Sequence, residues 1–339
     1  SIFAAMLTLM APPAYAAGSL LVDETFTGST VADPGFRPLS DACLTGSTTT
    51  TDGTTLGRCT RNTQAPTPGQ LPGYLQLNDT RRQVQGALVY NRPIPASSGI
   101  DIEFDQYQYS SGTNPGDGIS FFLVDGATNL TQPGAYGGSL GYAQLVSGTT
   151  NRPGVNGGYL GVGLDAYGNF GNDGEGRGSG CSTHPTTGLK PNTITLRGPG
   201  QGTSGYCWLG SATSPASLHV NTTASTPADS VARRIRITVS PDPIPVVTVY
   251  VNGTRVLQRT MPSAAPSTFK FGFAASTGGA TDTHLIRNVK VSTINPLAAI
   301  SLTKQIDRTS TQPAAYAPGA TIPYQFLVTN STVATITNV

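Results

Sequence analysis

Three oxygen-bearing side chains stand four residues apart in a glycine-rich stretch of the sequence. Asp165, Asn169 and Asp173 lie within YLGVGLDAYGNFGNDGEGRG, residues 159–178. In a helix they would share one face, but this stretch holds seven glycines, and each costs about 1 kcal/mol relative to alanine inside a helix. We therefore expect a strand that runs into a loop. Such a loop can direct carboxylate, amide and carbonyl oxygens at one centre, which suits calcium.

The spacing does not suit an EF-hand. In a loop starting at Asp165, Phe170 would stand where the sixth position needs glycine, and Gly176 would stand where the twelfth needs glutamate. A solvated turn rich in Asn, Asp and Gly is the alternative that the spacing alone leaves open.

The composition indicates what must position these residues. Of 339 residues, 37% are hydrophobic and 11% charged, with 41 Gly, 26 Pro and a net charge of +2. Short apolar runs alternate with turn residues, and no long segment has helical periodicity, which favours an all-β protein. The near-neutral charge gives no case for nucleic-acid binding. Roughly a dozen strands are predicted, at 19–28, 73–79, 86–94, 99–109, 117–126, 157–167, 192–198, 233–240, 246–259, 269–276 and 284–293.

The first residues have the composition of an export signal. Residues 1–16 lack a basic start but are apolar and end in a small-x-small site, Ala14–Tyr15–Ala16. We expect a signal-peptide remnant cleaved after Ala16, and hence a secreted or cell-surface protein; a buried strand or helix is the alternative. No later run reaches the length of a membrane span.

Four cysteines suit an oxidising compartment. Local pairing, Cys43 with Cys59 and Cys181 with Cys207, would staple two loops that have little apolar surface of their own. A zinc site is disfavoured because no C-x-x-C spacing occurs.

The character of the chain changes near Pro296. Residues 297–339 include PGATIPYQFLVTN, which resembles the core of immunoglobulin-like repeats found in tandem on bacterial surface proteins. About 40 residues are too few for a self-sufficient core. We expect the start of a truncated immunoglobulin-like β module.

Four stretches, in order, resemble the L-type (legume-type, concanavalin A-like) lectins. PGDGISFFLVDG (115–126) resembles the family's ADG-x-x-FF-x strand, and GGSLG (137–141) resembles its GG-x-LG loop. LGVGLDAYGNFGND (160–173) looks like its metal-binding loop, and FGFAASTGGATDTHLIRNVKV (271–291) looks like its late strand and loop. The resemblance implies a concanavalin A-like jelly-roll sandwich over residues 17–296.

The resemblance also implies one calcium site. Its ligands would be the carboxylates of Asp165 and Asp173, the side chain of Asn169 and the main-chain carbonyl of Tyr167, with Glu175 a candidate for a water-mediated contact.

A sugar would bind beside the calcium. Asp117 would accept hydrogen bonds from two hydroxyls, and the peptide bond before it would be cis. The Gly138 N–H and the Asn169 amide would donate, and the Tyr167 ring would stack on the sugar. The loop 278–281, with Gly279 and Ala280, would close one side. Sugar binding should then depend on calcium.

The transition-metal site of the plant lectins is predicted to be absent. Gly163 stands where those proteins have Glu, and Gly180 stands near the place of their His. His184 is close but out of register, and His219 and His284 stand alone, as structural histidines do.

These observations predict calcium-dependent carbohydrate binding by an exported, adhesin-type surface protein that is not an enzyme. Two alternatives stay open. A structural module could keep the fold without an active sugar site. A glucanase of the same fold needs two close carboxylates, but the three glutamates are far apart in sequence, so it would need a pair such as Asp117 and Asp165.

Overall fold

The computed structural model describes residues 18–330 except 51, 61 and 298–299. Leu20–Ser292 form one compact unit, and residues from Thr293 onward belong to another. The predicted signal-peptide remnant, residues 1–16, lies outside the described residues. Among the residues described, no helix is long and apolar enough to cross a membrane.

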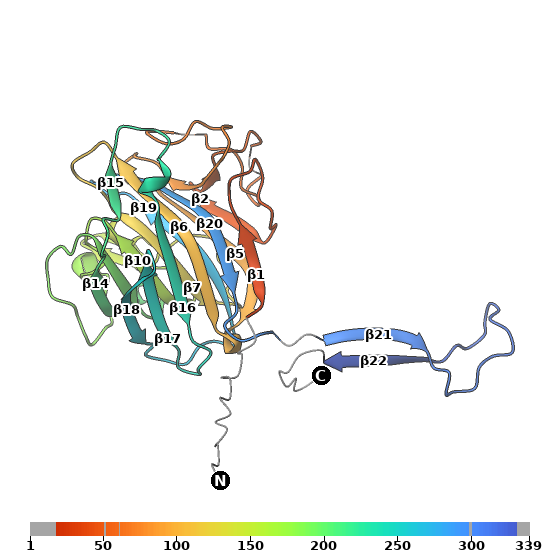
Figure 1. Ribbon diagram of the computed structural model, residues 1–339. Helices are drawn as coiled ribbons and strands as arrows, with labels where there is room; N and C mark the ends of the chain where they lie inside the picture. Colours follow the sequence, from red (N-terminus) through yellow and green to blue (C-terminus); the bar gives the residue numbers. More distant parts are fainter. Residues whose placement is uncertain (1–17, 51, 61, 298–299, 331–339) are drawn as a thin grey trace, which may run out of the picture. The chain divides into compact units, whose positions relative to one another are not determined.

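The larger unit is a sandwich of two nine-stranded sheets (Figure 1). Neighbouring strands are antiparallel except β15, which runs parallel to β6. The first sheet contains β1 (Leu20–Glu24), β3 (Cys43–Leu44), β4 (Leu75–Asn78), β6 (Ile100–Ser110), β15 (His219–Asn221), β16 (Arg233–Val239), β17 (Val246–Val251), β18 (Thr254–Thr260) and β20 (Thr283–Ser292).

The second sheet carries the strands that end at the site described below. Its central order is β10-β7-β19-β5. Its members are β2 (Phe36–Ser40), β5 (Gln85–Pro95), β7 (Gly118–Asp125), β10 (Gly158–Asp165), β11 (Thr193–Arg197), β12 (Gly200–Gln201), β13 (Ser204–Gly205), β14 (Trp208–Thr213) and β19 (Thr268–Ser276). The described loops add a small sheet of β8 (Leu145–Ser147) and β9 (Thr150–Arg152), and the 3-10 turns η1 (Ala96–Ser98), η2 (Gly137–Ser139), η3 (Gly174–Gly176) and η4 (Asp229–Val231).

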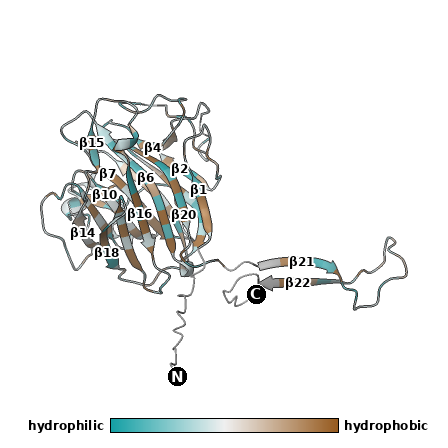
Figure 2. Cartoon of the chain, viewed as in Figure 1, coloured by the Kyte–Doolittle hydropathy of each residue, from teal (hydrophilic) through white to brown (hydrophobic). Residues whose placement is uncertain are grey.

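The main core lies between the sheets. Alternate residues of each strand point inward, as the two-residue period of a strand requires, and Figure 2 shows the hydrophobic stretches along these strands. Phe104 of β6 meets Phe273 of β19 edge-on with ring centroids 4.9 Å apart. Burial of each such ring contributes roughly 1.5–3 kcal/mol. The arrangement confirms the predicted all-β sandwich.

The second sheet is also covered on its outer face. Phe122 of β7 is buried there with Leu140 and Tyr142, from the segment between β7 and β10, and with Phe170, from the segment after β10. Its neighbour Phe121 faces the main core. This double burial explains the uninterrupted apolar run of β7. The covering segments are the ones that line the site.

All the strands predicted from the sequence form, and several short ones were missed. The range 246–259 forms a hairpin of β17 and β18, in which Asn252 and Gly253 take the positive φ values (49° and 80°) that a two-residue turn requires. Strand β2, with the sequence FRPLS, contains Pro38 and lies at the end of its sheet, where proline is tolerated. Its apolar signal was too weak to predict a strand.

Two disulfides have the predicted local pairing. Cys43 bonds to Cys59, and Cys181 bonds to Cys207. The second bridge joins the segment after η3 to the segment before β14. It thereby closes part of the loop region beside the site.

The smaller unit contains a hairpin of β21 (Ile300–Ile306) and β22 (Tyr324–Asn330). Leu302 and Phe326 are exposed on it, at 64% and 61%. Residues 331–339 of the expected module lie outside the described part. An immunoglobulin-like repeat over 297–339 therefore stays a prediction.

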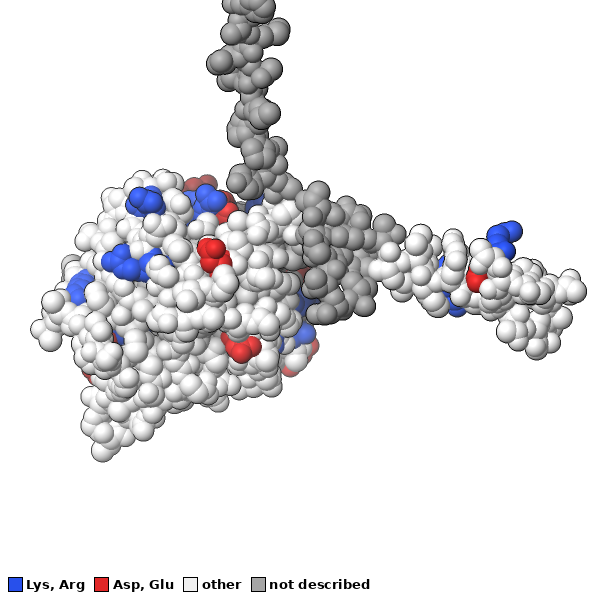
Figure 3. Space-filling model, turned by 90° about the horizontal axis from the view of Figure 1, so that it is seen from below, with Lys and Arg blue, Asp and Glu red and all other residues white. Residues whose placement is uncertain are grey.

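Charged side chains are sparse on the face shown in Figure 3. Blue and red side chains lie among uncharged residues, without a continuous basic patch.

Candidate functional site

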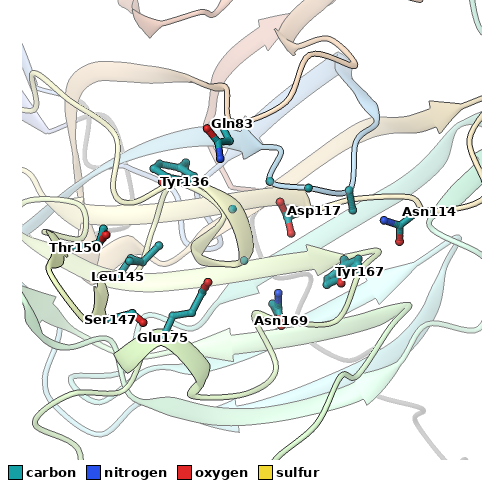
Figure 4. A pocket seen from close by; sticks show the side chains of 15 residues that line it. Gln83, Asn114, Asp117, Tyr136, Leu145, Ser147, Thr150, Tyr167, Asn169 and Glu175 are labelled. Atoms are coloured by element: carbon teal, nitrogen blue, oxygen red, sulfur yellow. The ribbon is translucent and has the colours of Figure 1, made fainter.

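A cavity of about 490 Å³ opens at one end of the second sheet. Figure 4 shows its lining side chains, contributed by the segment before β7, by the loop around η2, by the loop after β10 and by the loop after β19. All six residues predicted to touch a sugar line this cavity: Asp117, Gly138, Tyr167, Asn169, Gly279 and Ala280.

Asp117 is fixed by its backbone at the centre of the site. Its N–H donates to the Ser276 carbonyl at 3.0 Å, and its own carbonyl accepts the N–H groups of Ala166 (3.2 Å) and Tyr167 (3.1 Å). The Gly116–Asp117 peptide bond is cis, as the resemblance implied. These contacts tie the ends of β7, β10 and β19 together beneath the cavity.

The Asp117 carboxylate is buried and incompletely paired. The residue is 3% exposed, and Oδ2 has no hydrogen-bond partner among the described residues. Burial, with the nearby charge of Asp165, raises the pKa of Asp117 to about 7, and Arg177 opposes the rise. The side chain points into the cavity (Figure 4), so it can accept a hydrogen bond from a bound molecule.

Glycines at 116 and 278 allow the segments around the cavity to approach Asp117 closely. A Cβ on Gly116 would lie 2.8 Å from the Ala280 Cβ, and one on Gly278 would lie 3.0 Å from Asp117 Oδ2. Both distances are shorter than ordinary contacts between carbon and these atoms. A larger residue at either place would displace the loop after β19 or fill the space beside the carboxylate.

Asp165 does not line the cavity, although it was predicted to be a metal ligand. It is fully buried, and its Oδ1 and Oδ2 accept the N–H groups of Gly168 and Phe170, both at 2.7 Å. Burial raises the pKa of Asp165 to about 6, while these N–H groups lower it. The carboxylate therefore stabilises the loop that follows it, by accepting hydrogen bonds from the loop's backbone.

The other two predicted side-chain ligands also have protein partners. Asp173 Oδ1 accepts from Arg197 Nη2 at 2.8 Å, and its Oδ2 lies 2.6 Å from His184 Nδ1. Asn169 Oδ1 accepts from Asn172 Nδ2 at 3.4 Å. His184, out of register in the sequence, thus contacts one of the residues that calcium would need.

A fully buried arginine, Arg197 at the end of β11, binds this loop to the sheet. Besides Asp173, its guanidinium donates to the carbonyls of Phe170 (3.0 Å), Tyr206 (2.8 Å) and Asn172 (2.6 Å). Burial and the nearby Arg177 lower the pKa of Arg197 to about 10.

The second buried arginine, Arg177, lies closer to the cavity. It is 0% exposed, and its Nη1 donates to the carbonyls of Gly174 (2.6 Å) and Asn172 (3.3 Å). Its Nη2 donates to Glu175 at 3.0 Å. A Cβ on Gly138 would lie only 2.6 Å from this Nη2. The guanidinium therefore sits directly behind the cavity wall.

Four carboxylates act on the charge of Arg177, and one of them, Glu175, forms an ion pair with it. Burial lowers the pKa of its guanidinium, and the charges of four acidic residues raise it; they are, in decreasing order of effect, Glu175, Asp165, Asp117 and Asp173. Two of these four were predicted as calcium ligands, and one was predicted to hold the sugar. The positive charge near these carboxylates is therefore that of a protein side chain, Arg177.

The arrangement therefore does not fit the predicted calcium site of Asp165, Tyr167, Asn169 and Asp173. The oxygens of both aspartates are taken by N–H groups, an arginine and a histidine. Within the described part of the chain, no three His, Cys, Asp or Glu residues are placed to hold a metal ion. At the place of the plant lectins' glutamate, a Cβ on Gly163 would lie 2.2 Å from the Phe170 ring.

The carboxylate pair considered for a glucanase is not available to a substrate. Asp117 faces the cavity, but Asp165 is fully buried with both oxygens bonded to backbone N–H groups. Glu175 does line the cavity across from Asp117 (Figure 4).

Sequence reasoning missed several residues of this site. Tyr136, Asn114 and Gln83 line the cavity but lie outside the matched stretches, although Asn114 and Tyr136 each directly precede one of them. Arg177 and Arg197 were also missed, because one stands in a glycine-rich loop and the other ends a predicted strand, where arginine is usually solvent-exposed. The only feature of the sequence that could have indicated these two arginines is that each is a basic residue in or near a loop rich in acidic residues.

Comparisons with known proteins bear on the fold. No protein-family model matches the chain, and no curated protein matches it. Its structure is similar to the carbohydrate recognition domain of Emp47p (14% identity, 81% of this chain and 97% of that chain, TM-score 0.48). It is also similar to the VIP36 exoplasmic/lumenal domain in its Ca2+/Man3GlcNAc-bound form (13%, 77% and 83%, 0.44) and to metal-free lectin I-B4 from Griffonia simplicifolia (16%, 80% and 99%, 0.44). At these identities and scores, the likeness concerns the general arrangement of strands and not the residues of the site.

Proposed function

We propose that the cavity around Asp117 binds a carbohydrate and leaves it chemically unchanged. The observation that carries this proposal is the buried, unpartnered Oδ2 of Asp117 facing the cavity. A buried polar atom without a partner costs free energy. A sugar hydroxyl would supply the missing donor, and hydrogen bonds to a carboxylate are among the stronger ones.

The other lining groups suit the remaining surfaces of a sugar. The Asn169 amide can donate a hydrogen bond, because its oxygen already accepts from Asn172. Tyr167 and Tyr136 are half-buried and line the cavity, so each can place a ring against an apolar sugar face. Arg152 lies over the Tyr136 ring at 4.6 Å from its centroid and fixes its orientation.

We further propose that the protein acts outside the cytoplasm as an adhesin-type surface protein. Two disulfides suit an oxidising compartment. The predicted signal-peptide remnant and the predicted immunoglobulin-like module would serve export and display of the sandwich. We do not extend the proposal to calcium dependence, because the side-chain oxygens that calcium would need have other partners.

Glycan-array binding of the full chain tests the sugar site. Asp117→Asn keeps the shape of the side chain but removes its charge and places a donor against the sugar. We expect affinity for the best array ligands to fall by roughly tenfold to hundredfold. Asp125→Asn, at the exposed far end of β7, is the matched control and should bind normally.

Two results would count against the proposal. Absence of glycan binding by the unaltered, folded chain would favour a structural module. Release of reducing ends from a bound β-glucan would favour the glucanase alternative, with Glu175 as the second accessible carboxylate.

A further inference from the structure

We propose that the Arg177 guanidinium is a built-in cation that replaces a metal ion in this sugar-binding loop, so that the loop forms and binds without calcium. The part that concerns loop formation is independent of the proposed function; the part that concerns binding rests on it.

The first step of the argument is charge. Arg177 forms an ion pair with Glu175 at 3.0 Å, and the charges of Asp165, Asp117 and Asp173 also favour its protonated form. Arginine is protonated at every physiological pH, unlike histidine, and its charge is less tightly hydrated than that of lysine. It can therefore stay buried and positive in the place where a divalent ion would otherwise balance these carboxylates.

The second step is geometry. A metal ion would organise the loop by gathering carbonyl and carboxylate oxygens. Arg177 gathers the carbonyls of Gly174 and Asn172 and the carboxylate of Glu175. Arg197 takes the same Asn172 carbonyl from the sheet side, at 2.6 Å. The two arginines thus hold one loop between them through fixed, directional donors.

The third step is the link to the cavity. Arg177 Nη2 lies 2.6 Å from the position of a Cβ on Gly138, and the Asn169 Cβ lies 2.2 Å from that position. Gly138 and Asn169 are two of the residues proposed to donate to a sugar. Arg177 is therefore a positioning residue: it packs behind Gly138 and Asn169 and holds this part of the cavity wall in place.

Calcium itself is the first probe. With the full chain, we expect no saturable heat of calcium binding in calorimetry, no sensitised terbium luminescence, and the same Tm in EDTA as in millimolar calcium. Glycan binding should survive EDTA. Saturable calcium binding that raises the Tm would overturn the proposal.

Substitution of Arg177 is the second probe. Arg177→Met keeps most of the side chain's length but leaves the carboxylates unbalanced, so we expect the Tm in EDTA to fall by on the order of 10 °C. Calcium should then raise the Tm of this variant, which a merely structural arginine would not predict. Arg177→Lys should recover part of the Tm without a calcium response.

The control is Arg92→Met, whose arginine is 57% exposed and pairs with Asp33; its Tm should not respond to calcium. If Arg177→Met does not fold, the calcium arm on the unaltered chain and the Arg177→Lys variant still decide the question. An unchanged Tm in Arg177→Met would overturn the proposal. Loss of glycan binding under all conditions, with the Tm results as expected, would reject the proposed function and leave the built-in cation standing.

Discussion

Arg177 Nη2 donates a hydrogen bond to Glu175 Oε2 across 3.0 Å, which joins a fully buried cation to a carboxylate at the rim of the cavity. The Glu175 side chain is 49% exposed. Figure 4 shows its carboxylate directed into the cavity, opposite Asp117. A ligand in the cavity would thus lie between two carboxylates, one of which is paired with the buried guanidinium behind the wall.

The two members of this pair should contribute unequally to stability. Glu175→Gln removes a half-exposed charge, so we expect the free energy of unfolding to fall by less than about 1 kcal/mol. Arg177→Met removes a fully buried charge together with its hydrogen bonds to Gly174, Asn172 and Glu175, and should cost about 3–5 kcal/mol. Urea denaturation of both variants measures the difference. Equal losses would mean that the buried Arg177 charge contributes nothing beyond its ion pair with Glu175.

The Gly138 position should not accept a side chain. In Gly138→Ala the new methyl group would meet the Asn169 Cβ at 2.2 Å and the Arg177 guanidinium at 2.6 Å. We expect a loss of about 1–3 kcal/mol of stability and a loss of glycan binding. Glycan-array titration and urea denaturation measure the two effects.

Gly279→Ala is the matched control for that variant. Gly279 lines the same cavity, but a Cβ there has no atom within 4 Å. Its stability should stay within about 0.5 kcal/mol of the unaltered chain. A stable, binding-competent Gly138→Ala variant would show that the wall behind the cavity is not rigid.

The sequence predicted the strands that carry the site better than the contacts between the side chains within it. The alternating and continuous apolar runs predicted the strands, and the resemblance to the L-type lectins implied that Asp117, Tyr167 and the 278–281 loop share one site. The partners of Asp165 and Asp173 could not be predicted, because Arg177 and Arg197 meet the loop only after the chain has folded. Spacing shows which oxygens can converge, but not which cation they meet.

The two disulfides should differ in their effect on binding. Replacing Cys181 and Cys207 by alanine should lower the free energy of unfolding by about 3 kcal/mol, because the unfolded chain is no longer constrained by a bridge between residues 26 positions apart. It should also weaken glycan binding, since Cys207 follows Tyr206, whose carbonyl is bonded to Arg197. Calorimetry and array titration measure both effects.

The Cys43–Cys59 bridge provides the comparison. Its residues do not line the cavity, and its 16-residue separation predicts a similar stability loss. Replacing both cysteines by alanine should therefore destabilise the chain with glycan affinity unchanged. If both double variants lost affinity equally, the loss would reflect general destabilisation and not the Arg197 contact.

Asp117 should make the stability of the sandwich fall as the pH rises. Its pKa is about 7 in the folded chain, compared with about 3.9 in an unfolded one. The folded state therefore holds an extra proton between these values, and its advantage, fully present below about pH 4, is lost as the pH rises to about 7. Each pH unit in this window changes the free energy of unfolding by about 1.4 kcal/mol.

Urea denaturation of the unaltered chain and of Asp117→Asn at pH 5 and pH 7.5 isolates this contribution. Asp165, with a pKa raised to about 6, adds a slope of the same sign, and His284, whose burial lowers its pKa to about 3, adds one of the opposite sign. Both remain in the variant, so the difference between the two proteins belongs to Asp117. We expect the variant to gain on the order of 2 kcal/mol relative to the unaltered chain as the pH rises. Parallel pH profiles would mean that the Asp117 carboxyl is hydrated in solution, and would remove the unpaired oxygen on which sugar binding is argued.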